Sequence, residues 1–341
     1  MTSELAADLD ELLARTPRLW EGLRGARLFL TGGTGFFGTW LIESLLHADR
    51  ELGLGAKILV LTRDEDAFRA RSRHLADDRR VDFHRGDART FAFPPGGFTH
   101  VVHAATGPSD VIVSGTRRTL EFAAQCGANK FLFTSSGAVY GRQSPAVAHV
   151  AENDPSLVKP LDQPSDYAQG KREAERLCVS ASERGLDVSI ARGFAFVGPH
   201  LPLDANFAIG NFIRDALAGG PIVVDGDGTT WRSYLYAADL AEWLWTILLN
   251  GRSGHAYNVG SERCVAIAEL AEIVRRVVAP AAKVEIRQVP VPGAPAPRYV
   301  PSTRLAREEL GLSETVALEE SIRRTADWTL RRSRSISKGP I

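Results

Sequence analysis

The sequence has no surplus of either charge and no long hydrophobic run. Its 41 lysines and arginines balance 41 aspartates and glutamates, so the formal net charge is zero. A chain without a net positive field does not gather polyanions, and we therefore expect no nucleic-acid partner. No apolar run approaches the roughly 20 residues of a membrane span. The acidic N-terminus also lacks the basic start and apolar stretch of a signal peptide, so we expect no membrane association.

Cysteine is scarce as well. Cys126, Cys178 and Cys264 are odd in number and widely spaced, and they form neither a zinc-ligand pattern nor a disulfide framework. We therefore expect no metal site, and reduced thiols in a cytoplasmic protein. The chain has 341 residues, of which 44% are hydrophobic, and a chain of this length buries a core that needs no covalent or metal support.

Short apolar segments alternate with segments of helical length from residue 26 onward. The strand-like segments are 26–32, 57–63, 81–87, 100–106, 130–136 and 187–193. Near-continuous apolar strands separated by helices, such as 110–126 and 166–184, are typical of a parallel sheet with helices on both faces. The sequence thus predicts an α/β fold with a Rossmann-type doubly wound parallel sheet. Such a sheet binds ligands at the carboxyl ends of its strands.

The pattern changes beyond residue 198, where glycine and proline become frequent. Helices are still predicted there, at 206–218, 238–250, 266–278 and 316–330. The parts that we distinguish are an N-terminal helical extension (1–25), a Rossmann domain (26–197), a smaller mixed α/β C-terminal lobe that completes a cleft (198–330) and a polar tail (331–341). Within the C-terminal lobe, residues 238–260 are expected to pack back on the Rossmann domain.

A glycine-rich turn directly follows the first predicted strand. Gly32, Gly35 and Gly38 are spaced three apart and lead into a helical segment. The first glycine permits a tight turn, the second lets the backbone approach a pyrophosphate, and the third allows the helix to pack closely on the strand. The helix N-terminus, at Phe36 and Phe37, adds donors for phosphate. We therefore expect these five residues to bind a dinucleotide. A Walker-type loop is disfavoured because no Gly-Lys-Ser/Thr follows.

Later strand ends hold further candidates for the cofactor site. Arg63 ends the second strand, where an acidic residue would bind the adenosine ribose and an arginine can pair with a 2′-phosphate, so it favours NADP over NAD. The alternative is that Arg63 is solvated and Asp64 turns inward for NAD. Asp87 either reaches the adenine or caps a helix. The small residues Ala104 and Ala105 leave room for the cofactor at the next strand end.

Three residues form a candidate catalytic set. Tyr167 and Lys171 lie four apart in a segment of helical composition, so phenol and ammonium share one helix face. An ammonium and a nicotinamide beside a tyrosine lower the pKa of its phenol. The tyrosine can then act as acid/base for a substrate hydroxyl, and we expect both Tyr167 and Lys171 also to contact the cofactor. Ser136 ends a buried strand and can hydrogen-bond the substrate oxygen during hydride transfer. A Tyr-x-x-x-Lys pair alone is common on surface helices, so its weight comes from the order of all the motifs.

In combination, these motifs resemble the extended short-chain dehydrogenase/reductase superfamily, specifically its NAD(P)-dependent nucleotide-sugar epimerases and dehydratases, over about residues 26–330. In that family Ser-x-x-Val-Tyr-Gly holds the catalytic hydroxyl, and here the motif reads Ser136-Gly137-Ala138-Val139-Tyr140-Gly141. The resemblance implies a nucleotide-sugar substrate and a catalytic set of Ser136, Tyr167 and Lys171. It also implies a homodimer built on the two long helices, although their apolar pattern is equally consistent with packing on the chain's own sheet.

Substrate residues are implied by the same resemblance. The segment from Arg232 to Asp239 is similar to the family signature Arg-Asp-Phe-x-x-Val-x-Asp, so Arg232 should bind the diphosphate, with Arg298 as a second candidate. Asn206 lies twenty residues before Gly226, in a register similar to that of the family's sugar-diphosphate asparagine. The alternatives are that Asn206 caps a helix and that Arg298 is solvated.

Two departures from the family bear on the reaction. Its 4,6-dehydratases have Asp-Glu where Gly137 and Ala138 stand, and its sugar-acid decarboxylases have Glu at the second position; neither residue here transfers protons. Ala195 and Val197 replace a common Asn and Tyr, so the sugar pocket is less polar. We expect an epimerase or reductase acting through a 4-keto sugar. The alternatives are a dehydratase or decarboxylase, and a non-catalytic NAD(P)-sensing module that the retained Tyr/Lys pair disfavours.

Overall fold

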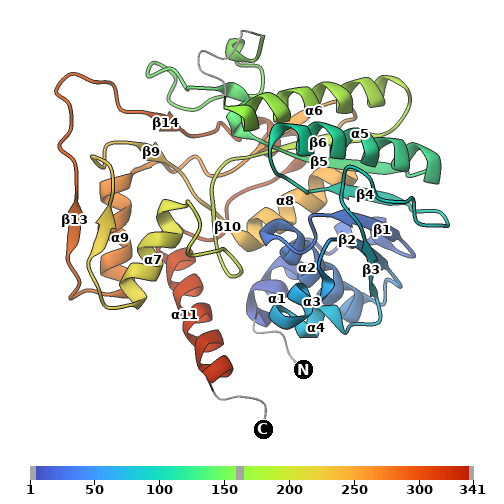
Figure 1. The fold of residues 1–341 in the computed structure, drawn as a ribbon, viewed down its shortest axis with the longest axis horizontal. Coiled ribbons are helices and arrows are strands. Elements are labelled where there is room, and N and C mark those ends of the chain that lie inside the picture. The colour runs from blue at the N-terminus through green and yellow to red at the C-terminus, as the bar shows by residue number, and fades with distance from the viewer. Residues whose placement is uncertain (1–4, 159–164, 338–341) are drawn as a thin grey trace.

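A seven-stranded parallel sheet organises the first lobe of the protein (Figure 1). The structure is a computed structural model that describes residues 5–158 and 165–337. In spatial order the strands are β11 (Ala256–Val259), β6 (Val188–Gly193), β5 (Lys130–Ser136), β4 (His100–His103), β1 (Arg27–Thr31), β2 (Lys57–Thr62) and β3 (Val81–Arg85). All neighbouring pairs are parallel. The predicted doubly wound α/β fold is confirmed.

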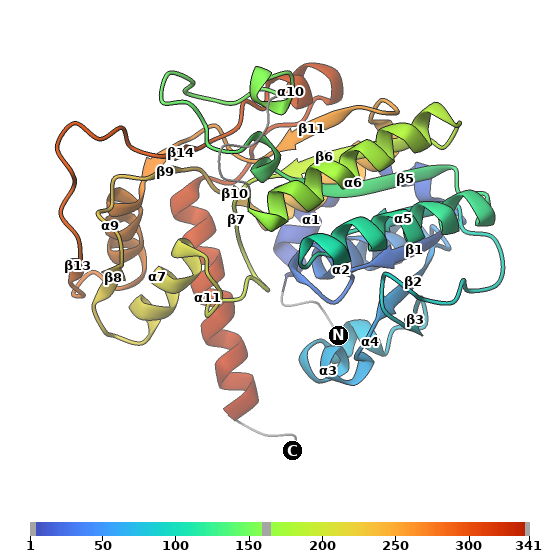
Figure 2. The ribbon, with the colours of Figure 1, turned by 45° about the horizontal axis from the view of Figure 1, so that its top comes forward.

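Helices cover both faces of this sheet. In both views α5 (Ser109–Cys126) and α6 (Asp166–Glu183) lie side by side on one face (Figures 1 and 2). On the other face α2 (Phe36–Leu52) and α8 (Ala237–Asn250) pack together (Figure 1). Strand alternation supplies both cores, because neighbouring side chains point to opposite faces. In β1, Phe29 packs against Phe122 of α5, whereas Leu28 and Leu30 join the core under α2 and α8. Short helices α3 (Glu65–Arg71) and α4 (Arg73–Ala76) connect β2 to β3.

The C-terminal lobe has a separate hydrophobic core. Its helices α7 (Ala208–Leu217), α9 (Ile267–Val278) and α11 (Leu318–Ser337) pack together beside short strands. These strands are β8 (Ile222–Val224) with β13 (Val284–Ile286), and β12 (Val265–Ala266), β9 (Trp231–Arg232) and β14 (Arg298–Tyr299) in a second small sheet. Strands β7 (Phe196–Val197) and β10 (Leu235–Tyr236) pair where the two lobes meet, and α10 (Arg304–Leu310) packs on α8 and β11.

The outermost helices of the chain differ in part from expectation. Helix α1 (Ala6–Arg15) and a 3₁₀ turn, η1 (Leu19–Leu23), form the N-terminal extension, and α1 packs on α2 and α8. Residues 331–341 are predicted to be a polar tail, but α11 continues to Ser337 and residues 331–337 are helical. The reason is that this arginine-rich run contains good helix formers and no glycine or proline before position 339. Residues 338–341 lie outside the described part.

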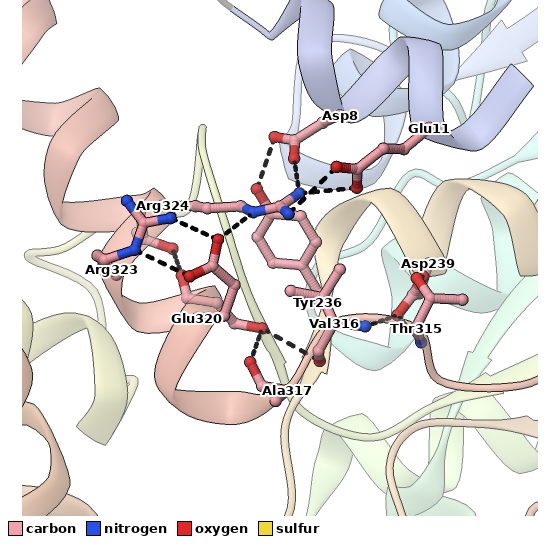
Figure 3. Close-up of polar contacts among 12 residues, drawn as sticks. Asp8, Glu11, Tyr236, Asp239, Thr315, Val316, Ala317, Glu320, Arg323 and Arg324 are labelled. Atoms are coloured by element: carbon pink, nitrogen blue, oxygen red, sulfur yellow. Dashed lines mark hydrogen bonds and ion pairs between the residues drawn. The ribbon is translucent and has the colours of Figure 1, made fainter. Parts of the chain in front are cut away.

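A polar cluster joins α1 to α11 across the two lobes (Figure 3). Arg324 of α11 forms ion pairs with Asp8 at 2.5 Å and with Glu11 at 3.0 Å, and Tyr236 donates a hydrogen bond of 2.7 Å to Asp8. The cluster attaches the C-terminal lobe to the first lobe at one edge. Among the described residues, every helix is too short or too polar to cross a membrane.

Candidate active site

A cavity of about 1370 Å³ lies between the two lobes, at the carboxyl ends of the sheet strands. The predicted residues that line it are Gly32, Gly35, Phe36, Phe37, Ala104, Ser136, Tyr167, Lys171, Asn206 and Arg232. The predicted residues outside its lining are Gly38, Arg63, Asp87, Ala105 and Arg298. One cavity therefore holds the candidate catalytic residues together with the glycine turn.

The glycine turn makes a close approach that only glycine permits. Gly32 has a φ of +72°, and a Cβ there would lie 2.4 Å from the carbonyl carbon of Ala104. Helix α2 begins at Phe36, after Gly35 as N-cap, and the first N–H groups of a helix have no partner within it. Gly38 lies outside the cavity because it packs on Gly33. The turn can thus hold a diphosphate against the helix N-terminus.

The residues expected at the adenosine end lie beyond the cavity. Arg63 is exposed after β2, and the Asp64 carboxylate caps α3 by accepting a 2.9 Å hydrogen bond from the Ala67 N–H. Asp64 therefore binds its own helix instead of turning inward. Asp87 accepts hydrogen bonds from the guanidinium and backbone N–H of Arg89, and chiefly the guanidinium lowers the pKa of Asp87 to about 2.

Tyr167 and Lys171 are held at the start of α6. Ser165 caps this helix by accepting a 3.1 Å hydrogen bond from the Ala168 N–H. One turn separates Tyr167, which is 37% exposed, from Lys171, which is 2% exposed. The Lys171 ammonium donates a 2.7 Å hydrogen bond to the Thr134 carbonyl and lies 5.7 Å from the centre of the Tyr167 ring. Burial lowers the pKa of Lys171 to about 8.

Ser136 meets a tyrosine that sequence analysis missed. Its Oγ accepts a 3.2 Å hydrogen bond from the Ala138 N–H and lies 3.3 Å from the Tyr299 Oη. Tyr299 comes from β14 in the C-terminal lobe, and burial raises its pKa to about 12. Its neighbour Arg298, a predicted substrate residue, instead lies over the Trp231 ring at 5.0 Å, because successive strand residues point to opposite faces. This alternation was the one signal available for Tyr299.

Aromatic side chains fill the space beside Gly137. A Cβ at Gly137 would lie 2.7 Å from two atoms of the Phe194 ring and 2.8 Å from the Tyr299 Oη. The next residue, Ala138, lines the cavity, as do Phe194 and Ala195. Among the described residues that line the cavity, the carboxylates are Asp215, Asp225 and Asp227, all in the C-terminal lobe. Among the described residues, the first lobe therefore contributes no carboxylate to the lining of the cavity.

A buried polar network supports the catalytic strand ends from behind. Glu175 of α6 accepts a 2.5 Å hydrogen bond from Ser135 and forms an ion pair of 2.8 Å with Arg192 of β6. Arg192 also donates to the Tyr140 Oη at 2.9 Å, and Tyr140 donates to the Asn258 side chain at 2.7 Å. Sequence analysis assigned no role to these contacts, although an arginine in the apolar segment 187–193 signals a buried partner.

Two predicted substrate residues approach the cavity from the C-terminal lobe. Arg232 is half-buried on β9, and its guanidinium lies 5.5 Å from the centre of the Tyr299 ring. Burial lowers the pKa of Arg232 from its usual high value. Asn206 is exposed and precedes α7, whose N-cap is Phe207, so the structure does not show Asn206 as the cap. Both side chains remain candidates for binding a phosphorylated ligand.

Comparison with known sequences identifies a family model and relatives that match most of this chain. The model of the NAD dependent epimerase/dehydratase family matches residues 28–260. UDP-glucuronic acid decarboxylase 1 of Arabidopsis thaliana is 30% identical over 314 residues, which cover 89% of this chain and 69% of that protein.

Solved structures show the same fold. A dTDP-glucose 4,6-dehydratase of Streptomyces venezuelae, with NAD bound, superposes with a TM-score of 0.77 at 25% identity over 91% of this chain and 98% of that one. UDP-glucose 4-epimerase of Thermotoga maritima superposes with a TM-score of 0.75 at 19% identity, over 90% of this chain and 99% of that one. Both span the Rossmann domain and the C-terminal lobe together.

Proposed function

We propose that this chain, which belongs to the NAD dependent epimerase/dehydratase family, is a nucleotide-sugar epimerase or reductase that acts through a 4-keto sugar. The membership confirms the resemblance inferred from the motifs. The chain is thus a nicotinamide-dependent enzyme of the extended short-chain dehydrogenase type. One feature of the cavity selects among the reactions of this family.

That feature is the absence of a carboxylic side chain at positions 137 and 138, directly after Ser136. The resemblance implies acidic residues at both 137 and 138 for elimination and at 138 for decarboxylation, whereas this chain has Gly137 and Ala138. Phe194 and Tyr299 fill the space that a side chain at 137 would need. An epimerase or reductase needs no such acid, because only the C4 hydroxyl proton and a hydride move.

The residues of the cavity fit a nicotinamide dinucleotide and a sugar. Gly32, Gly35, Phe36, Phe37 and Ala104 would hold the cofactor, since all five line the cavity and the turn leads into the N-terminus of α2. When bound, the cofactor supplies a hydride acceptor and donor.

The catalytic set then handles the proton. Tyr167, as phenolate, takes the proton of the sugar C4 hydroxyl while hydride leaves C4, and Lys171 stabilises the phenolate. Ser136 hydrogen-bonds the C4 oxygen, and Arg232 binds the diphosphate. To form the epimer, Tyr167 would give the proton back to the C4 oxygen after the keto sugar has turned over in the cavity. A reductase carries out only this second half.

We propose NADP as the preferred cofactor. Arg63 is exposed at the end of β2, where it is available to a 2′-phosphate. Asp64, the acidic residue that would instead bind a ribose hydroxyl, caps α3. Both observations support the phosphorylated cofactor.

We also propose a homodimer of cytoplasmic location. Helices α5 and α6 lie side by side on the outer face of the first lobe (Figure 2). A groove of about 490 Å³ between them includes Leu120 and Leu177, which supports a helical interface. The three cysteines are free thiols, in keeping with a reducing compartment.

A decarboxylase is the second candidate, favoured by the identity to the plant UDP-glucuronic acid decarboxylases. The purified enzyme should be incubated with UDP-glucose or UDP-glucuronic acid in the presence of NAD⁺ or NADP⁺, and with a dTDP-4-keto-6-deoxy sugar in the presence of NADH or NADPH, and the products analysed by NMR. An isomeric sugar without net cofactor change indicates the epimerase, and NADPH consumption on the keto sugar indicates the reductase. Release of CO₂, a 4-keto-6-deoxy product from a hexose, or cofactor binding without any turnover would overturn the proposal. Tyr167→Phe should bind cofactor and lose turnover.

A further inference from the structure

The hydroxyl of Ser136 faces three neighbours: the Ala138 N–H, the Tyr299 phenol and the cavity. A serine hydroxyl offers one proton and two lone pairs. Its Oγ accepts from the Ala138 N–H at 3.2 Å and lies 3.3 Å from the Tyr299 Oη, and the side chain lines the cavity. If Tyr299 donates, both lone pairs of the serine are engaged, and its only proton is left for the cavity.

Tyr299 is held where it can donate. Its ring packs on Phe194 at 4.7 Å between centres, and the Arg232 guanidinium lies over it. The other acceptor within reach of the phenol is the Gly193 carbonyl, at a longer 3.4 Å. Because burial raises the pKa of Tyr299 to about 12, the phenol keeps its proton at every pH near neutrality.

We propose that Tyr299 is a positioning residue whose phenol donates a hydrogen bond to Ser136 and so directs the serine proton at the sugar oxygen. This inference rests on the proposed function, because it assigns a role within the same hydride-transfer site. Tyr299 pairs with Arg232 in the register of β14 and β9. Strand β9, which carries Arg232, the candidate for binding the diphosphate, therefore lies beside β14, which carries Tyr299. One small sheet thus takes part in both nucleotide binding and orientation of the serine.

Kinetics of the full-length enzyme test the inference on whichever sugar nucleotide the wild type converts. Tyr299→Phe should lower kcat about tenfold, as expected for one lost hydrogen bond, and change KM less than about twofold. Ser136→Ala should lower kcat further, and the double variant should match Ser136→Ala, because Tyr299 acts through the serine. Tyr257→Phe is the control: its phenol is bonded to Glu309 outside the cavity, and it should leave kcat unchanged.

Three results would overturn the inference. One is a Tyr299→Phe enzyme with wild-type kcat, and another is a Tyr299→Phe effect that persists undiminished in the Ser136→Ala background. The third is independent of turnover: a crystal structure of the wild type with the Ser136 Oγ and Tyr299 Oη beyond hydrogen-bond distance. A wild type that converts no sugar nucleotide would refute the proposed function alone, and the crystal structure would still test the hydrogen bond between Tyr299 and Ser136.

Discussion

Replacing Glu175 with methionine should destabilise the enzyme far more than loss of an exposed ion pair. The carboxylate is buried, accepts a hydrogen bond from Ser135 and pairs with Arg192 through both of its oxygens. Methionine keeps similar volume but leaves the Arg192 charge without its partner. Removing one member of a buried pair costs about 3–5 kcal/mol.

The expected shift is large enough for two independent assays. An unfolding entropy of about 2.1 cal/mol/K per residue gives roughly 0.7 kcal/mol/K for a chain of this length. The melting temperature should therefore fall by about 4–7 °C, measured by differential scanning fluorimetry, and urea unfolding followed by circular dichroism should give the free energy directly.

A second substitution and a matched control sharpen this test. Glu175→Met/Arg192→Met should recover part of the loss, because an apolar pair replaces a lone buried charge. Glu173→Met removes an ion pair on the same helix whose side chains are 44% and 75% exposed, and it should change stability by less than about 0.5 kcal/mol. The reasoning fails if Glu175→Met lies within about 1 kcal/mol of the wild type, or if the double variant is no more stable than the single one.

Further predictions concern the cavity and its two ends. Gly137→Ala should lower the free energy of unfolding, measured with urea, by about 1–3 kcal/mol, because the new Cβ meets the Phe194 ring. Gly220→Ala, with open space around the new Cβ, is the control, and equal losses of stability in the two variants would contradict the clash. Because the protonated form of Lys171 is the active one, kcat/KM should fall as pH rises through about 8; a flat profile to about pH 10 would refute this. Arg63→Glu should reduce the preference for NADPH over NADH at least about tenfold in kcat/KM, whereas the exposed Arg79→Glu should leave it unchanged.

The sheet and the placement of Ser136, Tyr167 and Lys171 around one cavity could be predicted because their signals are local. In β1, Leu28, Phe29 and Leu30 are all apolar since both faces are covered, and the pair Tyr167 and Lys171 lies within one helical turn. The fold followed from such runs together with the glycine spacing.

Contacts between distant segments could not be predicted in the same way. Tyr299 lies 163 residues from Ser136, and its two-residue strand is too short for alternation to indicate which residue it contacts. The partner of Arg192 is likewise set by how α6 packs on the sheet. The placement of Arg63 and Asp87 outside the cavity lining depends on how the strands and loops pack in three dimensions, which composition does not determine.

The crowding around Gly137 has a consequence for the engineering of new activities. An aspartate introduced there meets Phe194 and Tyr299 at once, so a library of single substitutions would discard it as a folding defect before its chemistry could be scored. Variants in which smaller side chains first replace Phe194 and Tyr299 would leave room for the carboxylate. Substitutions toward elimination chemistry are therefore epistatic, because an acidic residue at position 137 is tolerated only after the neighbouring aromatic residues have been replaced.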